Sequence, residues 1–298
     1  MAAGDPLPSP LTTPPPPVAN VLVSFPAPHV LLITLNRPAQ LNAIPSAQHA
    51  QLAALYAWYD AEPWLRCAVL TGAGRAFCAG ADLKEWNDIN NSNNNDAAAA
   101  PKGEKQQQQQ QQRWDTAGFG GLSNRAGKKP VIAAINGMCF GGGMEMAINC
   151  DVVVAARDEA RFGLPEVGVG VIALAGALPR LVRTVGRQRA AEMALLGRTT
   201  YRAEEMKGWG LVNFVVEGSG GVVGEAVRLA SEMADKSPDS VIVTREGLRL
   251  GWEGVGPELG TEILERGMYG RMDKGENMRE GVGSFVEKRR PVWRDSKL

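Results

Sequence analysis

The sequence is poor in histidine, and this shortage excludes several kinds of active site. His29 and His49 are the only two histidines among 298 residues. A Ser-His-Asp triad or a histidine-rich metal centre depends on imidazole groups. The four cysteines form no Cys-x-x-Cys pair. We therefore expect no metal site, and any catalysis must use carboxylates, backbone amides, lysine or tyrosine.

A net charge and long apolar runs are missing as well. The 32 Lys and Arg residues balance the 32 Asp and Glu residues, which argues against binding nucleic acid or an anionic membrane through an overall field. No apolar stretch approaches the roughly 18 residues that a membrane-spanning helix needs. Because no basic, apolar signal peptide opens the chain, we expect a reduced, intracellular compartment.

Composition divides the chain into a leader, a core and a C-terminal region. Residues 1–20 are rich in proline and predict a disordered leader. The core covers 21–230 and contains an Asn- and Gln-rich insert at 87–112, whose low complexity predicts a disordered loop. Residues 231–298 read as helices separated by glycines.

Apolar runs within the core predict strands that alternate with helices. The helix expected over 46–60 has Ser46 as its N-cap. The strands are expected at 29–35, 67–71, 130–137, 151–156 and 211–216. Near-continuous apolar strands between helices are typical of an α/β fold with a buried parallel sheet.

Two glycine-bearing turns, 78–82 and 140–145, each follow a predicted strand. Glycine permits a sharp turn and the close approach of a ligand. A helix start presents backbone N–H groups that have no intrahelical partner. Two such amides that converged on one point would form an oxyanion hole. Each turn taken alone is also compatible with a purely structural role.

Two glutamates lie close to these turns in the sequence. Glu145 falls in the first turn of a short helix expected over 144–149, where the helix dipole favours a negative charge. Glu166 follows Pro165 and taken alone is an ordinary loop carboxylate. The sequence by itself does not place the two side chains together.

A series of ordered motifs resembles the enoyl-CoA hydratase/isomerase (crotonase) superfamily. The resemblance extends over about residues 28–290, apart from the insert. Its motifs are Arg37-Pro38, 41–43, 69–72, 76–84, 129–145, 162–166, 180–186 and 281–289.

This resemblance implies a fold, a substrate and an assembly. The fold is an α/β spiral of repeated ββα units, followed by a helical C-terminal region at 231–298 that builds a homotrimer or hexamer. The substrate is an acyl-CoA thioester, and no cofactor is implied because coenzyme A is part of the substrate.

The resemblance also assigns the site residues. Glu145 and Glu166 are the catalytic carboxylates, with Glu145 mainly activating water and Glu166 mainly delivering the proton to Cα. The backbone amides of Ala81 and Gly142 form the oxyanion hole. The substrate and CoA path is lined by Ala79, Ala81, Asp82, Leu83, Lys84 and Gly142.

Because both glutamates are present, the predicted activity is that of an enoyl-CoA hydratase, a hydro-lyase of fatty-acid β-oxidation or of a specialised acyl-CoA route. One departure from the family's pattern leaves an enoyl-CoA isomerase as the alternative activity. Residues 171–179 replace a glycine-rich turn of the family's hydratases, and only Gly176 remains of the expected glycine pair. A third possibility is a non-catalytic acyl-CoA-binding subunit that interacts through the insert.

The sequence ends in Ser296-Lys297-Leu298. A C-terminal Ser-Lys-Leu is an address that the peroxisomal import receptor reads. We therefore expect a peroxisomal location and the import receptor as a partner.

Overall fold

Two β-sheets form the frame of the structure, a computed structural model that describes residues 10–88 and 117–298. The larger sheet has six strands: β1 (Val21–Ala27), β2 (Val30–Leu35), β3 (Cys67–Gly72), β5 (Val131–Ile135), β7 (Val152–Ala156) and β10 (Phe214–Val216), in this order. β1 runs antiparallel to β2, and the other pairs are parallel. The smaller sheet has four strands: β4 (Ala76–Cys78), β6 (Met138–Phe140), β8 (Arg161–Gly163) and β9 (Tyr201–Arg202).

The chain alternates between the two sheets and so repeats a ββα pattern. β3, β5 and β7 enter the larger sheet, and each is followed by a strand of the smaller sheet, β4, β6 or β8. A helical segment comes next: 83–88 after β4, α4 (Gly142–Ile148) after β6, and the turn Pro165–Val169 after β8. The predicted spiral of ββα units is confirmed. Because β4, β6 and β8 are parallel neighbours, the segments that follow them meet at one edge of the smaller sheet.

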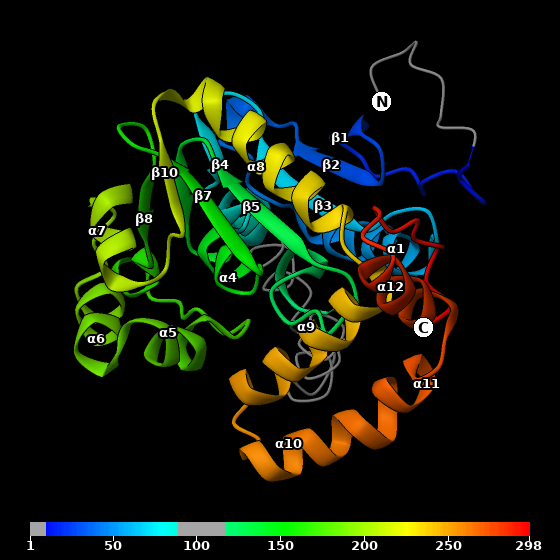
Figure 1. The fold of residues 1–298 in the computed structure, drawn as a ribbon. Coiled ribbons are helices and arrows are strands. Elements are labelled where there is room, and N and C mark those ends of the chain that lie inside the picture. The colour runs from blue at the N-terminus through cyan, green and yellow to red at the C-terminus, as the bar shows by residue number, and fades with distance from the viewer. Residues whose placement is uncertain (1–9, 89–116) are drawn as a thin grey trace, which may run out of the picture.

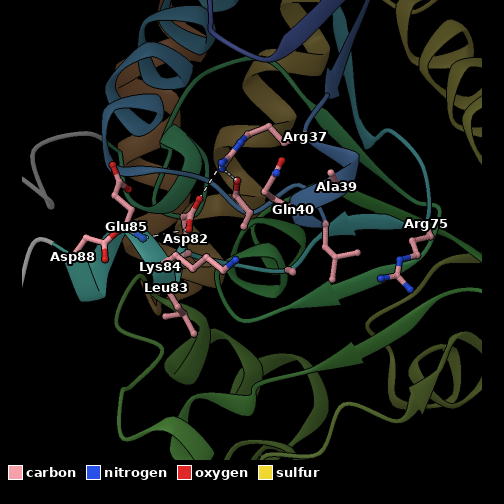
Figure 2. Close-up of a pocket in the computed structure, with 13 residues that line it drawn as sticks. Arg37, Ala39, Gln40, Arg75, Asp82, Leu83, Lys84, Glu85 and Asp88 are labelled. Carbon is pink, nitrogen blue, oxygen red and sulfur yellow. Dashed lines mark hydrogen bonds and ion pairs between the residues drawn. The ribbon is translucent and has the colours of Figure 1, made fainter.

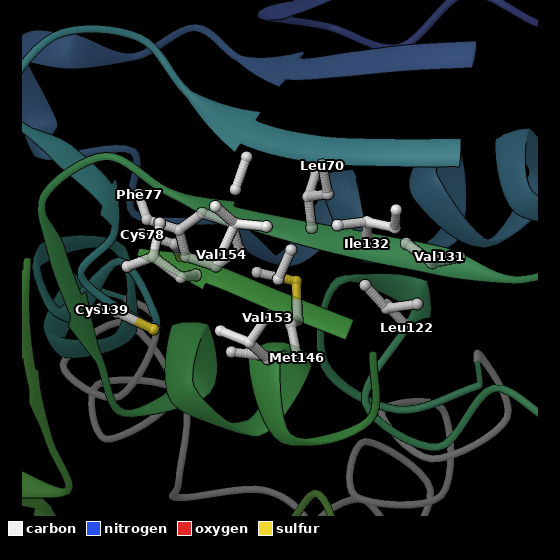
Figure 3. Close-up of a cluster of buried hydrophobic side chains, with 14 of the residues drawn as sticks. Leu70, Phe77, Cys78, Leu122, Val131, Ile132, Cys139, Met146, Val153 and Val154 are labelled. Carbon is white, nitrogen blue, oxygen red and sulfur yellow. The ribbon is translucent and has the colours of Figure 1, made fainter. Parts of the chain in front are cut away.

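Burial explains why the central strands are apolar. β3 and β5 are buried at every position, and β7 is buried at all but its first residue. α8 (Gly218–Ala234) packs across one face of the larger sheet, and α4 lies behind that sheet in the view of Figure 1. Figure 3 shows strand side chains such as Ile132 and Val153 gathered with Met146 of α4 into one apolar cluster.

The rest of the described chain is mainly helical. α1 (Ser46–Ala61) precedes β3, while α5 (Ala177–Val185), α6 (Arg187–Leu196) and α7 (Ala203–Trp209) follow β8. The C-terminal region holds α9 (Pro238–Trp252), α10 (Pro257–Leu264), α11 (Gly270–Met272) and α12 (Glu276–Val286). In Figure 1, α10 lies at the far edge of the molecule, away from both sheets. None of the helices in the described ranges is long and apolar enough to cross a membrane.

Part of the N-terminal leader packs onto the fold, contrary to the predicted disorder of residues 1–20. The Thr12 hydroxyl donates to Oε2 of the buried Glu62 at 2.7 Å, and the Trp58 indole N–H donates to the Thr13 carbonyl at 3.2 Å. Leu11 and Val18 pack against the core. Prolines did not prevent this docking because the segment needs no ladder of its own. Residues 1–9 lie outside the described residues.

Three further boundaries differ from prediction. Ser46 is the first helical residue and Pro45 is the N-cap, because the Ser46 amide and hydroxyl donate to Glu85 instead of capping the helix. The insert predicted at 87–112 lies outside the described residues except for 87 and 88, which continue the helical segment 83–88. The boundary expected between residues 230 and 231 falls inside α8, because that helix continues over the sheet to Ala234.

The C-terminal tripeptide lies against the surface of the fold. The Ser296 hydroxyl donates to Oδ1 of Asp239 at 2.5 Å, and the Lys297 ammonium pairs with Glu276 at 2.9 Å. The Lys128 ammonium donates to the backbone oxygen of Leu298. Helices α9 and α12 and the segment before β5 thus hold all three residues of the tripeptide.

Candidate active site

The first glycine-bearing turn presents the amide of Ala81 to a cavity. Ile44 donates its N–H to Gly80 O at 2.9 Å and accepts from the Asp82 N–H at 3.2 Å. Ala81 lies between these two bonds, so its own N–H points away from Ile44. Gly80 has a φ of +100°, a conformation that glycine adopts without strain. The turn therefore aims one backbone donor outward.

The second glycine-bearing turn presents the amide of Gly142. α4 begins at Gly142, so this N–H belongs to the first helical turn and has no intrahelical acceptor. The two turns are packed backbone to backbone. A Cβ on Gly80 would lie 3.2 Å from the Gly142 nitrogen, and one on Gly143 only 2.2 Å from the Cys78 carbonyl oxygen. Ala81 and Gly142 line the same cavity, as an oxyanion hole requires.

Glu145 enters this cavity from the first turn of α4. Its side chain is buried, and Oε1 accepts the Ala175 N–H at 2.7 Å and the Ala177 N–H at 3.4 Å. Burial raises the pKa of Glu145 to about 7, against the lowering effect of these two amides. The charge of Glu166 adds to the increase, which places the two carboxyl groups within electrostatic reach. A carboxyl group with a pKa near neutrality can exchange protons under physiological conditions.

Glu166 reaches the same cavity from the turn after β8. A Cβ on Gly141 would lie 3.2 Å from Oε1 of Glu166, so the carboxyl group sits over the second glycine-bearing turn. In the described part of the chain, Oε2 of Glu166 is buried and has no hydrogen-bond partner. Burial raises the pKa of Glu166 as well. A buried carboxylate oxygen facing a cavity is suited to a reacting water or substrate atom.

The cavity between these groups has a volume of about 200 Å³. One part of its wall is largely apolar and aromatic. The described residues of that wall are Leu83, Trp86, Phe119, Val169, Val171, Ile172 and Leu174, together with His49. The residues of the segment after Glu166, which are larger than the glycines expected there, thus form part of this wall. That segment still supplies the Ala175 and Ala177 amides that hold Glu145.

A larger groove of about 1040 Å³ adjoins the cavity (Figure 2). Ala79, Ala81 and Leu83 line both spaces, so the groove and the cavity share part of their walls. All the residues predicted for the CoA path line the groove except Gly142, which lines the cavity. The groove also holds Arg37 and Arg75, whose side chains the sequence analysis did not assign to the site.

An ion pair fixes the edge of the groove. Arg37 binds Asp82 at 2.9 Å and also donates to the Ala43 carbonyl at 2.6 Å. Asp82 in turn accepts the Glu85 N–H at 3.4 Å at the start of the segment 83–88. Partial burial works to raise the pKa of Asp82, but the bonds from Arg37 and from the helix start outweigh it and lower the pKa. Asp82 is therefore a charged anchor of the loop that carries Ala81.

The structure brings together all the residues predicted for catalysis and for the oxyanion hole. It adds His49 and Phe119, which the sequence analysis did not place in the site. Their rings are 4.7 Å apart and nearly perpendicular. Across residues 10–88 and 117–298, no group of three or more His, Cys, Asp or Glu side chains is arranged to hold a metal ion. The cavity thus brings the two carboxyl groups together with two backbone amides.

Comparisons with known proteins agree with this geometry. A family model described as Enoyl-CoA hydratase/isomerase matches residues 27–296. A protein of Beauveria bassiana named mevalonyl-coenzyme A hydratase is 63% identical over 96% of this chain and 99% of its own. A protein of the same name from Aspergillus fumigatus is 49% identical, over 95% and 98%. A crystal structure of enoyl-CoA hydratase from Mycobacterium tuberculosis gives a TM-score of 0.78 at 31% identity, covering 93% of this chain and 99% of that one.

Proposed function

Since the chain belongs to the enoyl-CoA hydratase/isomerase family, we propose that it interconverts a short, methyl-branched 2-enoyl-CoA and its hydrated 3-hydroxyacyl-CoA, with mevalonyl-CoA as the leading candidate for the hydrated form. The observation that carries the hydratase chemistry is the joint placement of Glu145 and Glu166 beside the amides of Ala81 and Gly142. The substrate comes from the two relatives named mevalonyl-coenzyme A hydratase, which match this chain almost end to end.

The arrangement performs hydration as follows. The thioester oxygen accepts the N–H groups of Ala81 and Gly142, which stabilise the enolate-like charge that develops there. The ionised Glu145 takes a proton from water as the water oxygen bonds to Cβ. Glu166, protonated at the start, gives its proton to Cα. Dehydration of a hydroxyacyl-CoA is the same sequence in reverse. The reaction therefore needs the pair of carboxyl groups with one proton shared between them.

The size of the cavity supports a short acyl group. A volume of about 200 Å³ is below the range of roughly 300–1,000 Å³ of drug-sized ligand pockets. Val171, Ile172 and Leu174 occupy the segment where a glycine-rich turn was expected, and they place side chains larger than glycine in the lining of the cavity. Mevalonyl-CoA carries a methyl and a hydroxyl group on its third carbon and a hydroxyl group on its fifth. We favour such a specialised route over general β-oxidation.

The groove supports binding of the CoA portion. Arg37, Arg75 and Lys84 bring positive charge to it, and CoA carries phosphate groups that such side chains bind. In Figure 2, Arg75 lies at one end of the groove and Asp88 at the other. This distribution favours phosphate contacts near Arg75 and disfavours them near Asp88. No cofactor beyond the substrate's own CoA enters the proposed reaction.

We also propose a homotrimer or hexamer built through the C-terminal helices. On α12, Val282 is 63% exposed and Phe285 is 84% exposed, while the buried positions Asn277 and Ser284 are polar. Leu259 and Ile263 of α10 are exposed as well. A helix that buries polar residues and exposes apolar ones presents a surface suited to another subunit. A second copy of this chain would cover it.

A peroxisomal location remains a proposal, supported by Ser296-Lys297-Leu298. The import receptor would be the partner. Because Asp239, Glu276 and Lys128 hold the three residues, the receptor must displace these contacts to read them.

Hydration in labelled water tests the reaction. The enzyme is incubated with enoyl-CoA substrates of increasing length, with and without a methyl branch on Cβ. Loss of the conjugated absorbance measures turnover, and mass spectrometry locates the oxygen label. Label at Cβ and a preference for the short, branched substrate are expected. Movement of the double bond without label would identify an isomerase and overturn the proposal.

A further inference from the structure

Arg180 lies at the start of α5, just beyond the segment that holds the carboxyl group of Glu145. Ala175 and Ala177 donate their N–H groups to Oε1 of Glu145 at 2.7 Å and 3.4 Å. Gly176 lies between these two donors, and a Cβ on it would collide with Nη1 of Arg180. The guanidinium group, which carries a permanent positive charge, therefore lies directly against the residue that joins the two donors.

The guanidinium group attaches this segment to two other parts of the fold. Its Nη1 donates to the Ser123 carbonyl and, at 2.9 Å, to Oδ1 of Asn124, both in the loop that follows Phe119. Its Nη2 pairs with Glu253 at the end of α9 at 3.3 Å. The side chain of Arg180 is only 11% exposed, so water competes little for these contacts. A planar fork of donors with several partners holds its surroundings in a defined geometry.

The elements packed against α4 determine the charge around its catalytic carboxyl group. They include β4, β6, α5 and the turn Phe119–Gly121, whose sequence has no titratable side chain. β4 and β6 each contribute one thiol, Cys78 and Cys139. Burial raises the pKa of both thiols, so they stay uncharged near pH 7. α5 brings the ionised side chains of Arg180 and Arg183.

Arg180 counteracts the groups that keep a proton on Glu145. Burial, with the charge of Glu166 adding to it, raises the pKa of Glu145 to about 7, while the two amides and the charge of Arg180 act to lower it. The described lining of the cavity has one further titratable side chain, His49. Arg183 is exposed and donates to a carbonyl at the end of α9. The positive charge that acts on Glu145 therefore comes from Arg180.

We propose that Arg180 is a positioning residue, which keeps the two backbone donors on Glu145 and supplies the positive charge that favours the ionised carboxylate. This inference rests on the proposed function, in which ionised Glu145 takes a proton from water. A positive charge near a carboxyl group favours its charged form. Arg180 is not among the described residues that line the cavity, so it acts through Glu145 and not on the substrate.

The pH dependence of kcat/KM for hydration of a short, methyl-branched 2-enoyl-CoA tests this role. The quantity measured is the position of the acidic limb, where the rate falls as Glu145 gains a proton. Arg180→Gln removes the charge, so the limb should move up by at least about half a pH unit. Arg180→Lys keeps the charge but not the planar fork, so the limb should stay near its wild-type position while kcat falls. Glu253→Gln removes the negative charge beside Arg180, so the limb should move down by a smaller amount.

Arg183→Gln is the matched control because it removes a positive charge from an exposed position on the same helix; its limb should coincide with that of the wild type. A merely structural role of Arg180 would lower kcat/KM equally at every pH and leave the limb in place, and that result would overturn the inference. Equal shifts in Arg180→Gln and Arg183→Gln would also overturn it. If Arg180→Gln does not fold, an unmoved limb in Glu253→Gln would overturn it alone. Absence of hydration by the wild type would instead contradict the proposed function.

Discussion

The reaction centre and the C-terminal helices α10 and α12 differ in which kinds of side chain they bury. Around the reaction centre, β3 and β5 are buried at every position, and all seven residues of α4 are buried. In the C-terminal region, α10 has no buried residue, and the buried residues of α12 are Asn277 and Ser284. In the first region apolar residues face inward, whereas on α10 and α12 the large apolar side chains Leu259, Ile263, Val282 and Phe285 face solvent.

This difference in burial indicates which of the two regions a single chain can form by itself. Every group assigned to the reaction comes from the segments after β4, β6 and β8, which the sheets and α4 hold in place. Among residues 10–88 and 117–298, nothing covers the exposed apolar side chains of α10 and α12 in this way. Changes at the reaction centre should therefore affect the rate without affecting assembly, and changes on α12 should affect assembly first. Each prediction below can contradict this separation.

The largest effect is expected from Glu145→Gln and Glu166→Gln. Each keeps the shape of the side chain but removes proton transfer, which is worth roughly 10²–10⁴ in rate. We expect kcat to fall by at least ~10² with each change and the double variant to lose less than the product, because both groups act on one water. Stopped-flow absorbance measures the rates. Glu258→Gln, an exposed change on α10, is the control. A nearly silent Glu145→Gln or Glu166→Gln would contradict the shared mechanism.

Gly142→Ala should have the next largest effect. The added Cβ would lie 2.5 Å from ring atoms of Phe119, so the ring or the amide must move. A displaced oxyanion donor costs roughly 10²–10³ in kcat. Gly251→Ala is the matched control because a Cβ there meets nothing within 4 Å on its helix. If Gly142→Ala left kcat intact at an unchanged thermal midpoint, this amide would not be an oxyanion donor.

The rate should also depend on pH through Glu145, whose pKa burial raises to about 7. Water activation needs the ionised form, so kcat/KM for hydration should fall about tenfold per pH unit below that value. Stability has the opposite dependence. The folded state holds the extra proton between pH 4.5 and about 7, so the free energy of unfolding falls as pH rises through this window. In Glu145→Gln both dependences should weaken; persistence of both would assign them to another group.

The sequence predicted the framework of the fold well. The runs 67–71, 130–137 and 151–156 became β3, β5 and β7 because long apolar stretches can only be buried between two layers. The short strands β8 and β9 were missed because they have three and two residues, too few to show a period. β8 pairs with β6 and β9 pairs with β8, in each case with a strand that lies far away in the sequence.

The site was predicted in part. Glu145, Glu166, Ala81 and Gly142 were assigned through a family resemblance, whereas their meeting depends on three parallel strands and no local pattern reveals it. His49 gave no signal, because its place in the cavity wall depends on Gly120 and Phe119, some seventy residues further on. The sequence likewise could not predict that residues 10–20 dock onto the fold, since this docking depends on the acceptor Glu62.

Assembly should depend on α12. Val282→Glu with Phe285→Glu places two charges on the exposed apolar face, and we expect the oligomer to dissociate or weaken at least tenfold, with smaller effects on kcat. Light scattering coupled to size exclusion measures the mass. Arg290→Glu, exposed beyond the end of α12, is the control. A wild-type mass equal to that of one chain would contradict the proposed oligomer.

The smallest effect concerns the C-terminal tripeptide. Glu276→Ala removes the partner of Lys297, an exposed ion pair at 2.9 Å. Exposed ion pairs contribute little, so we expect at most a severalfold gain in affinity of the full-length protein for the receptor domain that binds C-terminal Ser-Lys-Leu. Isothermal titration calorimetry measures it, with Glu258→Ala as the control. Weaker binding by Glu276→Ala would mean that the receptor itself uses this docked arrangement.

The docked tripeptide has a consequence for the order of events in a cell. The proposed import receptor would read residues 296–298 in the undocked tail, so its apparent affinity would be lowered in proportion to the fraction of chains in that state. The docking site depends on α9 and α12 being folded and packed together, because Asp239 and Glu276 belong to different helices. A newly made chain without this packing would present the tail fully. The receptor would therefore bind unfinished chains more tightly than finished ones.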